Sequence, residues 1–385
     1  MGPDHSSPAK VALLAVTVVV AVATVFYATG ARRNVTGFFR IGDRLPLSPF
    51  LSPARTTVFS NQPGYDGQYF LTVALDPLLS NPGSRLALDN ARWRYRRILY
   101  PALGWLLGCG RPWAIPWALV LLNAGSAVGL VAVLAVSLAK HGASPRLALW
   151  SLGFVGVWVA LFFSTADLLI TLLVTASVAA LVQHRPRTSA LCLALACLGR
   201  ETSLVLVPLF WVAAWRRSGL RATAVPLLAV VPWAAWNAFV LWRLPAADGP
   251  DAVVHHLAPP FTGLGHAFVS ACGSLPSPRG AFGFAALASL VLAAWLALPF
   301  RANTGEPLRQ IRLVGFGFVA LLALSGPSIL DYFMGSQRIF LPLFALVVLA
   351  LPWTRRRSAA LWIVLGFQSV CTGALVASRF LLPGP

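Results

Sequence analysis

Long apolar runs recur along almost the whole chain, and most connections between them carry arginine. A helix needs about 20 apolar residues to cross a bilayer. The chain is 58% hydrophobic and only 11% charged, whereas a soluble domain carries about 25% charged residues. These features predict an all-α polytopic membrane protein with about 11 transmembrane helices (10–12) and no separate soluble domain. The runs cover residues 11–29, 113–139, 147–163, 168–183, 188–199, 203–215, 223–242, 281–300, 311–325, 339–353 and 359–378.

The first run, 11–29, follows Lys10 and precedes Arg32 and Arg33. It is longer than the apolar core of about 7–15 residues in a signal peptide, so we interpret it as a retained first transmembrane helix. Residues 30–97 contain six prolines and no spanning run, which predicts a large extracytoplasmic loop. Residues 98–380 then form a helical bundle with a further outer loop at 244–280. We expect residues 1–385 to be a single integral membrane domain.

Positive charge decides the predicted orientation. The formal net charge is +19, and nearly all of it is arginine at the ends of apolar runs. There it sets topology and meets anionic lipid headgroups, so we expect membrane lipids and no nucleic acid as partners. With the N-terminus in the cytoplasm, all five cytoplasmic connections are basic, which predicts a multi-pass protein of the cell (plasma) membrane. They hold Lys140 and Arg146; His184, Arg185 and Arg187; Arg216, Arg217 and Arg221; Arg301, Arg309 and Arg312; and Arg355, Arg356 and Arg357.

Two short segments matter for this topology. Residues 98–109 are too few to span a bilayer, so we expect them to be re-entrant or interfacial. Counting them as a span would invert everything downstream. The runs 188–199 and 203–215 are also short, and the sequence leaves open whether they form a hairpin or one long helix over 188–215.

Acidic residues are few, and among those that map to the extracytoplasmic face in this topology are Asp66, Asp167, Glu201 and Asp331. A charge in the middle of a spanning helix costs about 2.5–3.5 kcal/mol on insertion scales, so it is normally paired or faces water. Two structural alternatives stay open. Glu201 could form an ion pair with the adjacent Arg200 or with a partner helix, and Asp167 could cap a helix N-terminus.

The stretch Tyr65-Asp66-Gly67-Gln68-Tyr69-Phe70 surrounds one carboxylate with aromatic rings and an amide, as a sugar site would. Its glycines also suit an ordinary turn. The cluster Arg94, Arg96 and Arg97 follows in the same loop. Planar guanidinium groups match phosphate oxygens, although simple headgroup anchoring would use the same residues.

Other residues give weaker signals. His255 and His256 lack spaced partners for a metal site and are expected in a solvated loop. The five cysteines also lack metal-ligand spacing, so no metal ligand is predicted. Asp331, Tyr332 and Arg338 could line the same site as Asp66.

These motifs resemble bacterial multi-spanning glycosyltransferases of the GT-C superfamily, especially integral membrane proteins of cell-surface glycopolymer formation, and distantly GPI mannosyltransferase II. The resemblance covers about residues 60–205 by the order and spacing of its motifs. One position departs from the pattern, because Asp167 stands alone where Asp-x-Thr-Glu is expected. The motifs are Tyr65-Asp66-Gly67-Gln68-Tyr69-Phe70, Asp76-Pro77, the segment from Arg94 to Pro101, Asp167, and Gly199-Arg200-Glu201-Thr202.

The resemblance implies a GT-C-like enzyme that transfers a sugar, of hexosyl or mannosyl type, from a polyprenyl-phosphate donor with inversion. The acceptor would be an extracytoplasmic glycan or lipid of the cell envelope. Such chemistry needs a base for the acceptor hydroxyl and cations for the departing phosphate. We assign Asp66 as the catalytic base. No cofactor is expected, although the departure at Asp167 leaves a divalent cation open. Residues expected to bind substrate are Tyr65, Gln68, Arg94, Arg96, Arg97, Asp167, Arg200 and Glu201.

Two other classes of function remain open from the sequence. A transporter or lipid flippase also uses intramembrane charges and broken helices, but this chain shows no repeat symmetry. A non-catalytic membrane subunit of a polysaccharide pathway would fit the loss of one expected acid.

The topology predicts distinct labelling from the two sides of the membrane. In a cysteine-free background, cysteines introduced at positions 66 and 167 should react with an impermeant maleimide from the outside, and one at 186 only after permeabilisation. Labelling of position 186 from outside would overturn the arrangement.

Overall fold

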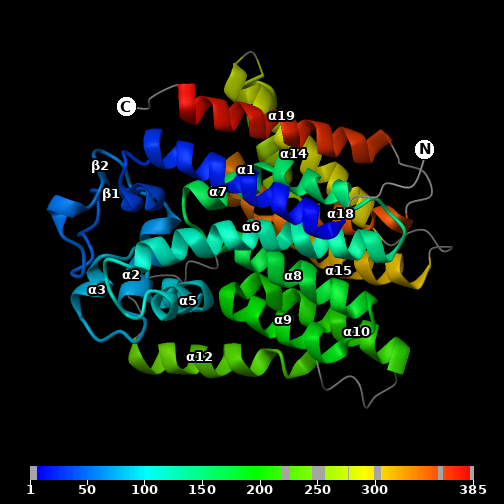
Figure 1. Cartoon of the computed structure of the whole chain (residues 1–385), viewed down its shortest axis with the longest axis horizontal. Helices are drawn as coiled ribbons and strands as arrows, with labels where there is room; N and C mark the ends of the chain where they lie inside the picture. Colours follow the sequence, from blue (N-terminus) through cyan, green and yellow to red (C-terminus); the bar gives the residue numbers. More distant parts are fainter. Residues whose placement is uncertain are drawn as a thin grey trace.

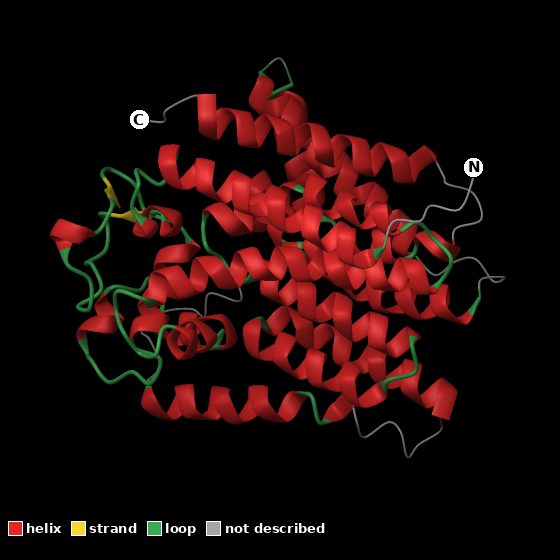
Figure 2. Cartoon of the chain, viewed as in Figure 1, coloured by secondary structure: helices red, strands yellow, loops and turns green. Residues whose placement is uncertain are grey.

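A computed structural model describes residues 7–218, 226–244, 256–275, 277–298, 305–353 and 359–381, which fold almost entirely into helices (Figure 2). His255, part of the loop predicted at 244–280, and the basic residues Arg221, Arg301 and Arg355 to Arg357 lie outside these residues.

The chain order of the elements is as follows. The first half contains α1 (Pro8–Thr29), β1 (Ile41–Gly42), β2 (Val58–Phe59), α2 (Asp66–Leu75), α3 (Gly83–Leu86), α4 (Ala91–Tyr95), α5 (Leu99–Leu107), α6 (Ile115–Lys140), α7 (Val155–Phe162), α8 (Asp167–Val182) and α9 (Pro186–Gly199). The second half contains α10 (Leu206–Ser218), α12 (Val230–Arg243), α13 (Thr262–Gly273), α14 (Pro278–Ala297), α15 (Glu306–Leu324), α16 (Pro327–Leu330), α17 (Phe333–Ile339), α18 (Leu341–Leu349) and α19 (Ala359–Leu381). Short 3-10 helices are η1 (Val35–Phe39), η2 (Pro53–Arg55), η3 (Pro145–Gly153), η4 (Glu201–Val205) and η5 (Leu351–Trp353).

Helices α7 and α18 form the centre of the bundle, and every residue of both is buried. A helix that is apolar on all sides must be surrounded by protein or lipid. Here α6, α8, α14 and α19 surround the pair (Figure 1). Helix α1 instead exposes Leu13, Leu14 and Val20, as a helix facing lipid would.

Within the described residues, five helices are long and apolar enough to cross a membrane: α1, α6, the Gly280–Ala297 part of α14, α15, and the Ala359–Ala377 part of α19. A sixth would be the pair η3 and α7, bent by 61° at Phe154. The helical fold and its apolar helices indicate a membrane protein, as the sequence predicts. The count of about 11 spans and the orientation stay predictions.

The structure bears on both short segments of the predicted topology, residues 98–109 and residues 188–215. Helix α5 has nine residues, which fits a segment that does not span. Residues 188–215 are not one long helix, because the extended backbone of Arg200 separates α9 from η4 and α10. Arg200 and Glu201 therefore stand at a break between helices, where their side chains can reach other elements.

The loop predicted at 30–97 folds into short elements gathered at one end of the bundle, the left end in Figure 1. Strands β1 and β2 pair in parallel, with Ile41 opposite Val58. Elsewhere, the Nζ of Lys140 donates a hydrogen bond of 2.8 Å to Gln183 Oε1. This bond joins the ends of two neighbouring helices whose following connections are both predicted to face the cytoplasm.

A buried network of amides ties α17 to α7, α14 and α19. The Nε2 of Gln368 donates to Ser289 Oγ at 2.7 Å and to Gln337 Oε1 at 2.6 Å, while its Oε1 accepts from the Val155 N–H at 3.2 Å. The Nε2 of Gln337 donates to the Ala286 carbonyl. Each buried polar group stabilises the packing only while its partners are present. The network fixes α17 immediately beside Arg338.

Replacing Gln368 by leucine should lower the melting temperature in detergent, because Val155 N–H and the Gln337 amide lose their partner in a buried site. The expected cost is about 1–3 kcal/mol. The neighbouring exchange Val370→Leu, at a residue that is 67% exposed, is the control and should leave the melting temperature unchanged. Equal melting temperatures for both variants would contradict a stabilising role for the network.

Candidate active site

Asp66 is the first residue of α2, directly after the turn at Pro63 and Gly64. Gly64 adopts a φ of +82°, which favours glycine and lets the chain enter the helix. A carboxylate at a helix N-terminus also interacts favourably with the helix dipole. Asp66 is therefore part of a helix rather than a turn.

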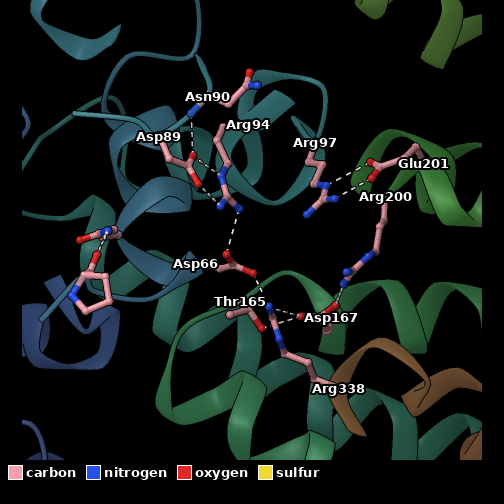
Figure 3. A network of polar contacts seen from close by, with 12 residues as sticks. Asp66, Asp89, Asn90, Arg94, Arg97, Thr165, Asp167, Arg200, Glu201 and Arg338 are labelled. Carbon is pink, nitrogen blue, oxygen red and sulfur yellow. Dashed lines mark hydrogen bonds and ion pairs between the residues drawn. The ribbon is translucent and has the colours of Figure 1, made fainter. Parts of the chain in front are cut away.

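Gly67 allows α2 to lie directly on the chain that precedes α8. A Cβ at this position would lie 2.1 Å from the carbonyl oxygen of Phe163, far inside van der Waals contact. The close approach brings Asp66 toward Thr165 and Asp167 (Figure 3). The glycine in the motif thus has a packing reason independent of chemistry.

Arg94 and Arg97 reach the same region from the loop. They are three residues apart on a helical turn at the end of α4, since the Arg97 N–H bonds to the Arg94 carbonyl. This spacing puts both side chains on one face. Arg94 Nη1 donates to Asp66 Oδ1 at 2.9 Å, and its Nε and Nη2 pair with both oxygens of Asp89.

Arg338, in the last turn of α17, joins the two aspartates. Its Nη2 pairs with Asp66 Oδ2, and its Nη1 donates to Asp167 Oδ2 at 3.0 Å. Its guanidinium carbon lies 4.9 Å from the centroid of the Tyr65 ring. A single arginine therefore links α2 and α8 to α17, as Figure 3 shows.

Asp167 and Glu201 complete the network. Asp167, only 3% exposed, also accepts from Thr165 Oγ1 at 2.7 Å and pairs with Arg200 Nη1. Glu201 forms a two-bond pair with Arg97, at 3.0 Å from Nε and 2.6 Å from Nη2. Two-bond arginine–carboxylate pairs fix orientation as well as charge. Together the network holds four guanidinium groups and, with Asp89, four carboxylates.

Six side chains of this network line a cavity of about 380 Å³. Asp66, Arg94, Arg97, Arg200, Glu201 and Arg338 give it a strongly charged part. An apolar part comes from η4, α15, α16 and the end of α17. The lining residues there include Leu204, Val205, Phe318, Leu321, Ile329, Ile339 and Phe340.

The charges around Asp66 determine its protonation. Burial alone would raise the pKa of the Asp66 carboxyl, but the positive charges of Arg338 and Arg94 outweigh it and hold the pKa well below its usual range. Asp66 is therefore an anion in the substrate-free site. Burial raises the pKa of the neighbouring Tyr65 hydroxyl, which stays neutral.

Four of the residues expected to bind substrate do not line the cavity: Arg96, Gln68, Tyr65 and Asp167. Arg96 lies on a different side of the helical turn from Arg94 and Arg97. Gln68 is structural, because its Oε1 accepts from Gly42 N–H and its Nε2 donates to the Pro63 carbonyl. Tyr65 lies beneath Arg338 and against the Phe163 ring. Asp66, Arg94, Arg97, Arg200 and Glu201 line the cavity, and Asp167 holds two of its arginines.

The structure decides the alternative for Asp167 and shows the ion pair of Glu201. Asp167 is not the N-cap, which is Ala166; its side chain binds arginines instead. Glu201 pairs with Arg97 across 104 residues of sequence, so an ion pair with another element is present. A structural ion pair and a substrate site are compatible readings of this contact.

Sequence reasoning gave Arg338 only a weak signal, yet it is central to the network. The available signal was a lone arginine within a mostly apolar stretch between 313 and 353, which a membrane protein retains only with a partner. Trp93 and His256 also line the cavity, and nothing in their sequence spacing indicated this. His256 thus lines the cavity from a loop position between α12 and α13, where it is partly buried.

No group of three or more His, Cys, Asp or Glu side chains within the described ranges is arranged to hold a metal ion. Comparison with protein-family models, curated proteins and solved structures finds no match to this chain. The chemistry of the site itself is therefore the guide to its function.

The close packing of Gly67 makes a direct prediction. Gly67→Ala should push α2 away from Phe163 and weaken the pairing of Asp66 with Arg338, lowering the melting temperature by several degrees. Gly125→Ala is the matched control, because a Cβ there meets no atom within 4 Å. An unchanged melting temperature for Gly67→Ala would contradict the packing role.

Proposed function

We propose that this protein is a membrane glycosyltransferase that transfers a sugar from a polyprenyl-phosphate donor to an extracytoplasmic glycan or lipid, with inversion. The observation that carries the proposal is a single cavity lined by four arginines, two carboxylates and a set of apolar residues. Phosphate, sugar and lipid each find matching chemistry in it.

The arginines suit the phosphate of such a donor. Taking four guanidinium groups out of water costs several kcal/mol each unless they are paired. Pairing with Asp66, Asp167, Glu201 and Asp89 meets that cost in the substrate-free protein. A phosphate, like a carboxylate, presents two oxygens that one guanidinium can bind through two parallel hydrogen bonds, so it can exchange for one of these partners.

The apolar side chains suit the first isoprene units of the carrier. Phe318 and Leu321 come from α15, one of the helices long enough to cross a membrane. A cavity of about 380 Å³ falls at the small end of the range of about 300–1,000 Å³ for ligand pockets. It would hold a sugar phosphate and only the start of a long lipid.

In the proposed reaction, the acceptor hydroxyl oxygen attacks the anomeric carbon, and the bond from that carbon to the phosphate oxygen breaks. The hydroxyl proton passes to Asp66, and the carrier leaves as a phosphate monoester with one more negative charge. The arginines stabilise that charge as it develops.

The ion pairs of Asp66 add a condition to this mechanism. A carboxylate with both oxygens held by Arg94 and Arg338 is a weak base. When a donor phosphate draws these arginines toward itself, the pKa of Asp66 rises and the carboxylate can accept a proton. Donor binding would thus activate the base, so that Asp66 can accept a proton only when the donor is present.

The decisive experiment incubates the purified protein with a panel of polyprenyl-phosphate sugars and an acceptor mixture. Release of lipid phosphate together with a new glycoside supports the proposal. Movement of lipid between leaflets without bond cleavage would favour the flippase alternative.

Asp66→Asn should reduce transfer by about 10²–10⁴-fold, the usual contribution of a general base, with membrane insertion intact. Asp43→Asn in the same loop is the matched control. Asp43 accepts backbone bonds from Asn61 and Gln62 and does not line the cavity, so activity should remain. Full activity in Asp66→Asn would refute its role as base.

A further inference from the structure

Histidine has an ordinary pKa near neutral pH. His256 is the cavity residue of this kind, whereas the other ionisable side chains in the lining, over the described residues, have ordinary pKa values far from neutral. Apart from His256, the ionisable side chains that line the cavity are Asp66, Glu201, four arginines and Tyr332, with the lining taken over the described residues. None of those has an ordinary pKa between 5 and 8, whereas histidine does.

Two contacts of the ring and one of the backbone hold His256 in the cavity wall. Its Nδ1 lies 3.2 Å from Ser328 Oγ in α16. Its ring centroid lies 6.0 Å from that of Trp93, and the guanidinium carbon of Arg97 lies 4.5 Å from the Trp93 ring centroid. Its carbonyl accepts from the Gly326 N–H at 2.8 Å. With Nδ1 bonded to Ser328, Nε2 is the ring nitrogen left for a ligand.

The charges around the ring set its state in the substrate-free protein. Burial lowers the pKa of His256, and the positive charge of Arg97 lowers it further. The neighbouring groups are Arg97 and Arg94 from the end of α4, Asp66 from α2 and Arg200 from the break between α9 and η4. At neutral pH the imidazole is therefore uncharged and can accept a proton.

We propose that His256 takes up the proton that the transfer reaction releases, so that its imidazolium compensates the new negative charge on the departing lipid phosphate. This inference rests on the proposed glycosyl transfer. Protons and electron pairs balance in this step. The acceptor oxygen loses its proton to Asp66, and the phosphate keeps the electron pair of the broken carbon–oxygen bond. The proton then passes from Asp66 to His256. Asp66 returns to its anionic form, ready to pair with Arg338 again.

The same reasoning predicts proton uptake when a phosphate binds without any reaction. A dianionic phosphate beside the ring raises the pKa of His256. At a pH between the free and bound values, binding then draws protons from the buffer.

The first test measures single-turnover transfer against pH. Wild-type activity should fall at acid pH, where His256 is already protonated. His256→Gln should be about 10²-fold slower or more and should lose this acid limb. His266→Gln is the control, since His266 pairs with exposed Asp331 and does not line the cavity; it should keep the wild-type profile. A His256→Gln variant with the wild-type rate and acid limb overturns the inference.

The second test does not depend on turnover. Titration calorimetry with decyl phosphate, in buffers of different ionisation enthalpy, should show greater net proton uptake by the wild type than by His256→Gln. Equal proton exchange by the two proteins overturns the inference. Absence of turnover by the wild type refutes the proposed transfer instead, and the calorimetric comparison then decides only whether His256 takes up a proton beside a bound phosphate.

Discussion

The bridge that Arg338 forms between Asp66 and Asp167 is the interaction on which the site depends. It joins a loop helix, the start of α8 and the end of α17, three segments that lie 101 and 171 residues apart in sequence. Each aspartate also binds a second arginine, so no charge in the bridge is held by one contact alone. Breaking one partner of a buried pair leaves an uncompensated charge at a cost of about 3–5 kcal/mol. The three segments are therefore coupled strongly.

The surrounding packing serves this bridge. Gly67 lets α2 approach the Phe163 carbonyl, and Gly156 lets α7 approach the backbone of Gln337 and Arg338, because a Cβ there would lie 2.4 Å from the Gln337 carbonyl oxygen. The Gln337–Gln368–Ser289 network then fixes α17 from the opposite side. Close backbone contacts through glycine and hydrogen bonds between helices are the usual means of packing helices without a hydrophobic driving force. The polar site thus rests on a rigid apolar bundle.

A site whose arginines are already paired with carboxylates is well suited to an anionic substrate. In the proposed mechanism, the carboxylates hold the positions that phosphate oxygens take when the donor binds, and their ion pairs keep the arginines oriented. Substrate binding then becomes an exchange of partners rather than the desolvation of free charges. The same exchange alters the protonation of Asp66 and His256, which links binding to proton transfer in the proposed mechanism.

The sequence by itself determined the helical membrane character, the acidic motif and the grouping of Asp66, Asp167 and Glu201. Hydropathy and charge reach these conclusions because a bilayer penalises unpaired charge wherever it lies in the chain. Only the tertiary structure decided which arginine meets which acid. Arg338 and His256 come from segments far from the motif, and Arg96 turns away while Arg97 turns inward. Such pairings depend on helix packing and rotation about each helix axis, to which hydropathy is blind, and they set the chemistry of the site.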